Sequence, residues 1–156
     1  QPELDKTRVG IYGGSYGGYV VLASLTNCPT RFKAGVDVVG IANFISFLEK
    51  TADYRRDLRR EEYGDERDPK VRAVLEQISP LNNAEKIQAA LFVAHGQNDP
   101  RVPVNEAHLI VEKMRSLGRP VWFANALDEG HGFRKKANSD LFQVLMMHFW
   151  QEHLLK

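Results

Sequence analysis

The feature that most constrains the fold is a regular alternation of short apolar runs with segments of helical character. Four runs are rich in β-branched or aromatic residues and end in turn residues: Arg8–Tyr12, Ala34–Gly40, Ala90–Ala94 and Val121–Ala126. Runs of this kind are typical of strands that are covered on both faces. Alternation of such strands with helices places the helices on both faces of the sheet. The sequence therefore predicts an α/β fold with a parallel sheet.

Three further segments carry the patterns of helices. Gly17–Thr26 is apolar and rich in small residues, and Val104–Leu117 is followed by Gly118, a residue type that commonly ends helices. Asp140–Leu155 has the apolar spacing of a helix with one buried face. Its predicted N-cap is Asn138 or Ser139, and its predicted buried face comprises Leu141, Val144, Leu145, His148 and Phe149. His148 is therefore expected to be a core histidine.

Length and composition bound the class of protein. With 156 residues, of which 43% are hydrophobic, the chain fits one globular domain. Its 21 basic and 20 acidic residues leave a net charge of +1, so we expect neither nucleic acid nor a membrane as a partner. Cys28 is the only cysteine, which excludes an internal disulfide and fits a cytoplasmic location. The chain begins at Gln1 rather than Met, so its natural start is expected further upstream.

One segment, Glu49–Arg72, is strongly charged but balanced, with eight basic and eight acidic residues. We interpret it as a solvated helix and loop. Ion pairs three residues apart are expected within it, such as Asp53 with Arg56 and Asp57 with Arg60. The alternative interpretation is a cap that contributes to substrate access.

The sharpest local motif is Gly13-Gly14-Ser15-Tyr16-Gly17, which contains G-x-S-x-G between an apolar run and a helical segment. In that context the motif predicts a serine on a tight strand-to-helix turn with its hydroxyl exposed. We expect Gly13 and Gly17 to let the neighbouring elements pass without a Cβ clash. The helix N-terminus would bring the Tyr16 N–H close to a developing oxyanion. The alternative is a glycine-rich turn with an incidental serine.

A serine hydroxyl needs a base to take its proton, and the base needs an orienting acid. In α/β-hydrolases these residues follow one another in the order serine, acid, histidine. Asp99 and His131 occur in that order, each just after a predicted strand. Because ligand sites of parallel sheets lie at the carboxyl ends of the strands, we expect Ser15, Asp99 and His131 to converge at that edge.

Other residues compete for these roles. Asp128 and Glu129 are alternative acids, but they lie too close in sequence to the histidine to be held by a separate strand. Asp37 lies within a predicted strand and is expected to face a neighbouring helix. His95 is expected to support the turn before Asp99 rather than to act in catalysis.

Three stretches together resemble the prolyl oligopeptidase family of serine peptidases. Arg8–Tyr19 resembles the family's nucleophile segment, His95–Pro103 its aspartate segment and Glu129–Phe133 its histidine segment. Ser79-Pro80 is a further familiar feature. The resemblance covers nearly the whole chain, and the combination of motifs is far more specific than any one of them.

The resemblance implies that residues 1–156 are the C-terminal part of an α/β-hydrolase catalytic domain, without its N-terminal strands and any β-propeller. It implies Ser15 as the nucleophile, Asp99 as the orienting acid and His131 as the general base. The Tyr16 backbone amide is then one oxyanion donor. Arg101 occupies the position, two residues after the acid, at which some relatives have an arginine that contacts a carbonyl of the substrate peptide. The alternative is an arginine that is simply exposed on the surface.

The activity implied by the resemblance is hydrolysis of short peptides through an acyl-enzyme, with no metal and no cofactor. A carboxylesterase on the same fold and a non-catalytic fragment are the alternatives. The missing strands would leave one edge of Arg8–Tyr12 unpaired. We therefore expect a piece of a longer enzyme, weakly active or inactive alone, or a homodimer formed through that sheet edge.

Overall fold

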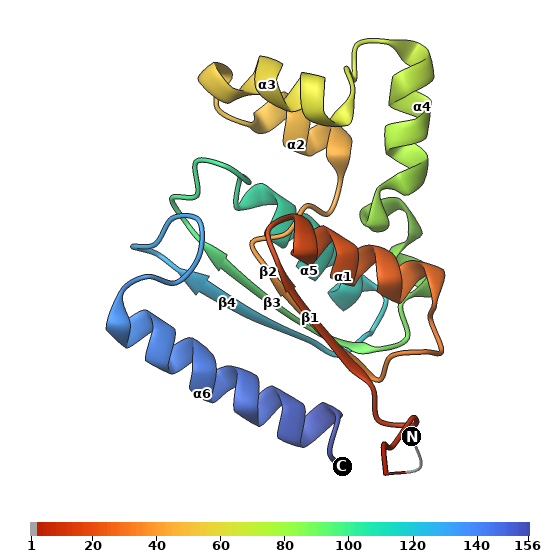
Figure 1. Ribbon diagram of the computed structural model, residues 1–156, viewed down its shortest axis with the longest axis vertical. Coiled ribbons are helices and arrows are strands. Elements are labelled where there is room, and N and C mark those ends of the chain that lie inside the picture. Colours follow the sequence, from red (N-terminus) through yellow and green to blue (C-terminus); the bar gives the residue numbers. More distant parts are fainter. Residues whose placement is uncertain (1–2) are drawn as a thin grey trace.

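Four parallel strands form the centre of the protein, whose computed structural model describes residues 3–156 (Figure 1). The strands are β1 (Gly10–Gly14), β2 (Ala34–Val38), β3 (Ala90–Gly96) and β4 (Val121–Ala126). They lie side by side in chain order, and all three pairings are parallel. The predicted α/β fold with a parallel sheet is confirmed.

Two strands extend further toward the carboxyl edge of the sheet than their apolar runs indicate. β1 continues to Gly14 because that residue stays in register with Val38 of β2. β3 continues to Gly96, which lies opposite Ala126 of β4. The ladder therefore positions the backbone up to the residues that precede the functional loops.

Within residues 3–156, six helices and one 3-10 helix connect and follow the strands. They are α1 (Tyr16–Asn27), α2 (Phe44–Lys50), α3 (Asp53–Tyr63), α4 (Pro69–Ile78), the 3-10 helix η1 (Pro80–Lys86), α5 (Asn105–Ser116) and α6 (Lys136–His153). α1 and α5 pack on one face of the sheet, where Leu22 and Ile110 share a buried cluster with Leu91 of β3. α6 covers the other face with Phe142 and Phe149 (Figure 1).

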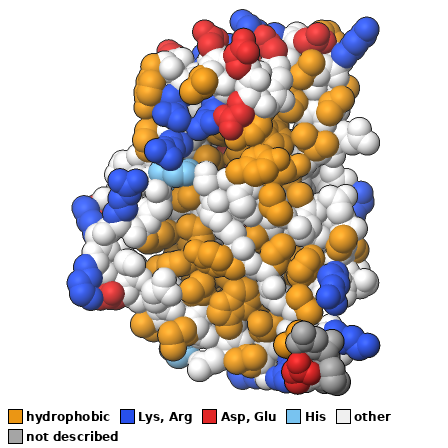
Figure 2. Space-filling model, in the orientation of Figure 1, with side chains coloured by type: hydrophobic (Ala, Val, Ile, Leu, Met, Phe, Trp, Pro, Cys, Tyr) orange, Lys and Arg blue, Asp and Glu red, His pale blue; other side chains and the backbone are white. Residues whose placement is uncertain are grey.

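The two outer strands are less buried than expected. β2 and β3 are buried along their whole length, whereas β1 alternates between exposed and half-buried residues and β4 is half-buried throughout. Within residues 3–156 the outer edge of β1 pairs with no strand. Tyr12 of β1 and Val20 of α1 are exposed, and Figure 2 shows hydrophobic side chains gathered over these two elements. Coverage of both faces therefore holds for the central strands only.

Helix α6 differs from its prediction in both its start and its buried face. It begins at Lys136, because Asn138 donates its side-chain amide to Asp128 and Glu129 in the preceding loop instead of capping the helix. Phe142 and Phe149 are buried against the sheet, whereas His148 is exposed. The expectation of a core histidine there is wrong, as is the placement of two predicted core residues that prove exposed, Leu141 and Val144.

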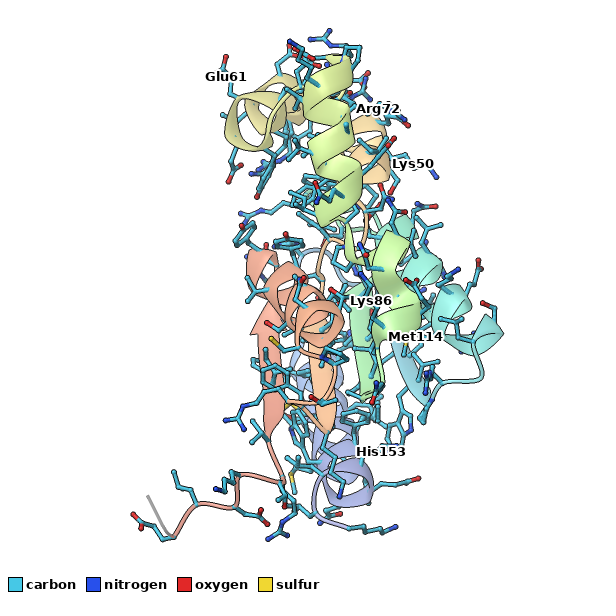
Figure 3. All side chains as sticks on the ribbon, turned by 90° about the vertical axis from the view of Figure 1, so that its right-hand side faces the viewer. Lys50, Glu61, Arg72, Lys86, Met114 and His153 are labelled. Atoms are coloured by element: carbon cyan, nitrogen blue, oxygen red, sulfur yellow. The ribbon has the colours of Figure 1, made fainter. Side chains whose placement is uncertain are left out.

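Helices α2, α3 and α4 are inserted between β2 and β3 and lie beyond the carboxyl ends of the strands (Figure 1). In the side view, Glu61 of α3 and Arg72 of α4 lie at the end of the molecule opposite His153 (Figure 3). Asn43 caps α2 by accepting the Ile45 and Ser46 N–H groups. We call α2, α3 and α4 together the cap. None of the helices described for residues 3–156 combines the length and apolar character needed to cross a bilayer.

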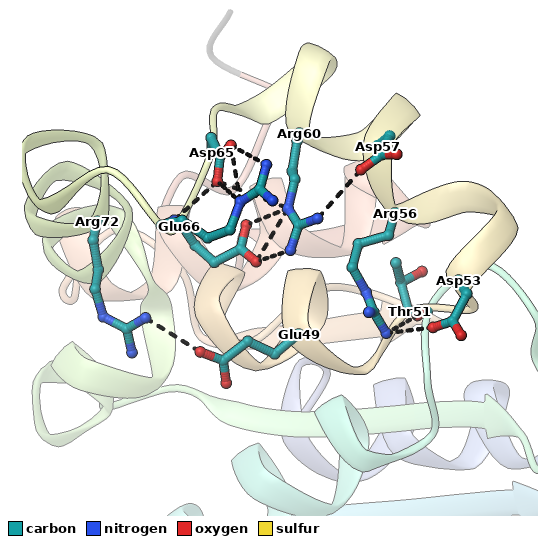
Figure 4. A network of polar contacts seen from close by, with 10 residues as sticks. Glu49, Thr51, Asp53, Arg56, Asp57, Arg60, Asp65, Glu66 and Arg72 are labelled. Atoms are coloured by element: carbon teal, nitrogen blue, oxygen red, sulfur yellow. Dashed lines mark hydrogen bonds and ion pairs between the residues drawn. The ribbon is translucent and has the colours of Figure 1, made fainter.

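Ion pairs organise the charged part of the cap (Figure 4). The expected pairs of Arg56 with Asp53 and of Arg60 with Asp57 are present, at 2.7 and 3.3 Å. Arg60 also donates to Glu66, with Nε 3.0 Å from Oε2. The Glu66 side chain is only 3% exposed, and hydrogen bonds from Arg60 hold its pKa below the usual range although burial opposes this. The segment is therefore more than a solvated surface.

Loss of Arg60 should loosen the cap. Arg60→Ala leaves the buried Glu66 carboxylate without its cation, which is a costly arrangement. In the enzyme that contains this chain, we expect faster hydrogen exchange in α3, by roughly an order of magnitude or more. Arg67→Ala is the matched control because Arg67 pairs with Asp65 on the surface. Equal exchange in the two variants would contradict a structural role for the Arg60–Glu66 pair.

Candidate active site

The strand-to-helix turn after β1 holds Ser15 in an unusual backbone conformation. Its φ of 59° and ψ of −122° lie outside the regions that residues with a Cβ ordinarily adopt. The Ser15 N–H donates to the Val38 carbonyl across the sheet at 2.8 Å. A Cβ on Gly13 would lie 2.2 Å from the Gly17 carbonyl oxygen, so the turn closes only over a glycine at position 13. The backbone therefore presents Ser15 at the carboxyl edge of the sheet.

The second glycine that the turn requires is one position later than the motif indicates. A Cβ on Gly17 would meet no atom within 4 Å outside the backbone of its own helix, so the expectation that a glycine is needed at position 17 to avoid a Cβ clash is wrong. A Cβ on Gly18 would lie 2.2 Å from Asp37 Oδ1 and 2.7 Å from the Gly40 Cα. The first turn of α1 packs directly against the end of β2 at this point.

The structure brings Ser15, Asp99 and His131 together from three separate loops. His131 Nε2 lies 2.9 Å from Ser15 Oγ, and His131 Nδ1 lies 2.7 Å from Asp99 Oδ2. A carboxylate only accepts hydrogen bonds, so Nδ1 carries the proton and Nε2 accepts from the serine hydroxyl. This geometry forms a continuous relay from the hydroxyl through the imidazole to the carboxylate.

The backbone and the fold around it keep Asp99 in its orienting position. Its side chain is fully buried, and Oδ1 accepts the Arg101 and Val102 N–H groups at 2.8 and 3.0 Å. Burial raises the pKa of Asp99, but hydrogen bonds from His131 and from these backbone groups outweigh it and leave the pKa below its ordinary value. The second carboxylate oxygen, Oδ2, faces His131, and His95 Nε2 lies 3.5 Å from it.

His95, Asp128 and Glu129, the alternative candidates, stabilise the loops around the relay. His95 is buried, and its Nε2 donates to the Val102 carbonyl at 2.9 Å, which ties the end of β3 to the loop after Asp99. Glu129 accepts the Lys135 N–H at 2.7 Å and the Asn138 amide. Asp128 pairs with the Lys135 ammonium. Neither acid hydrogen-bonds to the histidine of the relay.

Tyr16 and Arg101, next to the relay, offer hydrogen-bond donors and an exposed aromatic ring to a substrate. Tyr16 is the first residue of α1, and within residues 3–156 its N–H has no hydrogen-bond acceptor. The helix N-terminus adds a favourable field for a negative oxygen at this point. The Tyr16 ring is 51% exposed. Arg101 is exposed, and its side chain makes no hydrogen bond or ion pair within the same residues.

A cluster of aromatic side chains that the sequence pattern does not predict lies beside the nucleophile. Tyr63, at the end of α3, stacks on the Tyr16 ring with centroids 6.1 Å apart and an angle of 16°. Tyr19 and Phe44 lie edge to face at 4.9 Å, and Phe44 is 5.3 Å from Tyr63. Burial raises the pKa of Tyr63 to about 12, so its hydroxyl stays protonated. No local sequence signal links position 63 to position 16, because the contact is made by the cap.

Two buried carboxyl groups lie behind the site. Asp37 on β2 is fully buried, and its Oδ1 has no hydrogen-bond partner within residues 3–156. Glu106 on α5 accepts the Ala42 and Asn43 N–H groups. Burial raises the pKa of each group to about 7. Within the described residues no group of three or more His, Cys, Asp or Glu side chains is placed to hold a metal ion.

A parallel sheet with helices on both faces, with a Ser–His–Asp relay at the carboxyl ends of its strands, defines a chain of the α/β-hydrolase class. The sequence pattern of the prolyl oligopeptidase family matches residues 1–156. The chain belongs to the prolyl oligopeptidase family.

Several relatives carry the names of peptidases. Dipeptidyl aminopeptidase BIII of Pseudoxanthomonas mexicana is 37% identical over 148 residues, which are 93% of this chain and 22% of that protein. Dipeptidyl peptidase family member 6 of Caenorhabditis elegans is 37% identical over 139 residues, 86% of this chain and 19% of that protein. The chain thus spans about a fifth of the length of these relatives.

Solved structures agree with the fold. The acylaminoacyl peptidase of Pyrococcus horikoshii superimposes with a TM-score of 0.89 at 28% identity, over 99% of this chain and 25% of that one. A Mycobacterium tuberculosis puromycin-hydrolyzing peptidase gives a TM-score of 0.88 at 29% identity, over 96% of this chain and 22% of that one. The arrangement of strands and helices is therefore that of the matching parts of these peptidases.

A methyl group at position 18 should displace the serine. In the enzyme that contains this chain, Gly18→Ala forces α1 away from Asp37 and Gly40, and we expect kcat/KM to fall roughly 100-fold. Gly17→Ala is the matched control, because its Cβ meets no atom within 4 Å, and should lose much less. Similar losses in the two variants would contradict the assignment of the close approach to Gly18.

Asp37 should make stability depend on pH. In the unfolded chain this carboxyl loses its proton near pH 4, whereas in the folded chain its pKa is about 7. As the pH rises from 4 to 7 the unfolded state is favoured, so this contribution to stability is lost over that window. The Tm of Asp37→Asn relative to the unchanged enzyme should therefore rise between pH 4 and pH 7. A difference that stays constant with pH would show that Asp37 ionises normally.

Proposed function

We propose that the enzyme containing this chain is a serine peptidase that cleaves short peptides through an acyl-enzyme on Ser15. The observation that carries the proposal is the relay of 2.9 and 2.7 Å from the Ser15 hydroxyl through His131 to Asp99. Membership of the prolyl oligopeptidase family and the peptidase names of its relatives support peptides as the substrate class.

The first half of the reaction forms the acyl-enzyme. Ser15 Oγ attacks the carbonyl carbon of the peptide while His131 Nε2 takes the hydroxyl proton. The negative charge on Asp99 stabilises the imidazolium that results. When the tetrahedral intermediate collapses, the C–N bond breaks and His131 gives its proton to the leaving amine.

The second half restores the enzyme. A water molecule gives a proton to His131 Nε2 as its oxygen attacks the acyl carbon. The bond to Ser15 Oγ then breaks, and the proton returns to the serine as the carboxylic acid leaves. Each half forms an oxyanion, which the Tyr16 N–H is positioned to bind. The family resemblance implies a second donor, a tyrosine hydroxyl, on a segment of the parent enzyme outside this chain.

The outer edge of β1 supports a further part of the proposal. Unpaired strand edges are templates for another strand. We propose that a preceding segment of a longer enzyme occupies this edge, with a homodimer as the alternative. The oligomeric state of the parent enzyme and of this chain alone, measured by light scattering, distinguishes them. The proposed location is the cytoplasm, which the lone and unpaired Cys28 supports.

Esterase activity is the second candidate. Esterase LipC of Mycobacterium tuberculosis is 28% identical over 154 residues, and the same relay cleaves esters as well as amides. Matched aminoacyl amide and acyl ester substrates distinguish the two functions. We expect the enzyme to hydrolyse the amide, whereas turnover of the ester alone would overturn the peptidase proposal.

Removal of the serine hydroxyl should abolish turnover. In the enzyme that contains this chain, Ser15→Ala is expected to lower kcat by roughly 10⁴–10⁶-fold, because the nucleophile is lost while the oxyanion site remains. Ser116→Ala, at the exposed end of α5, is the control and should retain activity. A fluorophosphonate probe should label Ser15 in the folded enzyme. Turnover close to the unchanged enzyme in Ser15→Ala would refute the assignment.

A further inference from the structure

Helix α3 of the cap spans the mouth of the site. Just before α3, the Thr51 hydroxyl donates to the Arg101 carbonyl in the loop that carries Asp99, at 3.3 Å. At the other end of α3, Tyr63 stacks on Tyr16 beside the nucleophile. The helix therefore runs from the acid loop to the nucleophile turn, beyond the carboxyl ends of the strands (Figure 1).

One face of α3 is turned toward the relay. Arg55, Arg59 and Tyr63 are spaced four residues apart, so they share a face of the helix. The stack of Tyr63 on Tyr16 fixes the direction of that face. The Arg59 guanidinium carbon lies 6.0 Å from the Tyr63 ring centroid, and both arginines are half-buried. Arg59 therefore lies beside the aromatic stack next to the nucleophile, and Arg55 is one turn earlier on the same face, with its guanidinium carbon 5.9 Å from the Tyr54 ring centroid.

Arg55 carries charge that the cap does not neutralise, and the only anion that pairs with Arg59 within residues 3–156 is the exposed Glu62. Arg56 and Arg60, the neighbours in sequence, are tied to carboxylates within the cap (Figure 4). Arg55 takes part in no ion pair within residues 3–156, and its Nε is buried without a hydrogen-bond partner. Arg59 Nε is also buried and unpartnered, although another nitrogen of Arg59 pairs with the exposed Glu62.

Basic side chains are visible on the surface between the cap and the sheet (Figure 2). Figure 2 shows Lys and Arg side chains gathered where the underside of the cap faces the loops at the carboxyl ends of the strands, next to a histidine. A half-buried guanidinium without an anion is costly, and a carboxylate satisfies it with paired N–H···O bonds. Arg55 has no carboxylate acceptor within residues 3–156, and Arg59 Nε is free although another nitrogen of Arg59 pairs with Glu62, so both side chains retain donors for a ligand.

We propose that Arg55 and Arg59 form a subsite that binds a carboxylate of the substrate close to the scissile bond. The subsite rests on the proposed peptidase function and adds a substrate preference to it. The carboxylate belongs either to an acidic side chain or to the free C-terminus of a short peptide. Both present the same planar anion to the guanidinium groups.

Two matched pairs of peptides test the subsite in the enzyme that contains this chain. The first pair has a C-terminal amide and differs only by Glu or Gln next to the scissile bond. The second pair is neutral in its side chains and differs only by a free or an amidated C-terminus. We expect kcat/KM to favour the carboxylate by about tenfold in one pair, which also identifies the source of the anion.

Variants then assign the preference to the cap. Arg55→Gln and Arg59→Gln should bring the ratio of kcat/KM within that pair toward one, and Arg55→Lys should retain part of it. The ratio is measured on one preparation, so it does not depend on the fraction of enzyme that is folded. Arg115→Gln, in the exposed last turn of α5, is the control and should keep the ratio unchanged.

The outcomes separate the two proposals. Equal hydrolysis within both pairs by the unchanged enzyme, or an unchanged ratio in both glutamine variants, would overturn the subsite and leave the peptidase proposal intact. Failure to hydrolyse any of the four peptides would overturn the peptidase proposal, and with it the subsite.

Discussion

Parallel hydrogen bonding between neighbouring strands is the constraint on which the site depends. Because all three pairings are parallel, the loops after β1, β3 and β4 leave the sheet at the same edge. Residues as far apart in sequence as Ser15 and His131 then meet within hydrogen-bond distance. The acid loop and the histidine loop also contact each other directly, because the Asn98 N–H donates to the Glu129 carbonyl at 2.9 Å. A strand that slipped in register would separate the three side chains and would also expose buried side chains of β2 and β3.

Buried groups behind this edge fix the positions of the reacting ones. Asp99 is held by two backbone N–H groups, and the turn that supplies them is tied to β3 by His95. On the opposite side, Asp37 and Gly18 lie in direct contact, so the nucleophile turn abuts β2 without a gap. The reactive atoms are consequently supported by rigid parts of the fold, which is what a preorganised site requires.

The sequence allowed prediction of those features that depend on local pattern and chain order. The strands, the nucleophile turn and the convergence of Ser15, Asp99 and His131 follow from apolar runs, a motif and the topology of parallel sheets. Helix α6 starts before the predicted N-cap, and Asn138 bonds instead to side chains of the preceding loop. The choice between Gly17 and Gly18 depends on β2, and the stack of Tyr63 on Tyr16 depends on the path of the cap. Such contacts join distant residues and leave no periodic trace.

The cap leaves the body and returns to it at nearly the same point. The Leu81 N–H, after the cap, donates to the Ala42 carbonyl, before it, at 2.9 Å. A segment whose two ends touch can change in length or be exchanged with little disturbance to the framework that carries it. If the cap sets the substrate preference as proposed, selectivity and chemistry reside in separable segments of the chain. Exchange of this segment between related enzymes would change their substrate preference while the Ser–His–Asp relay stays the same.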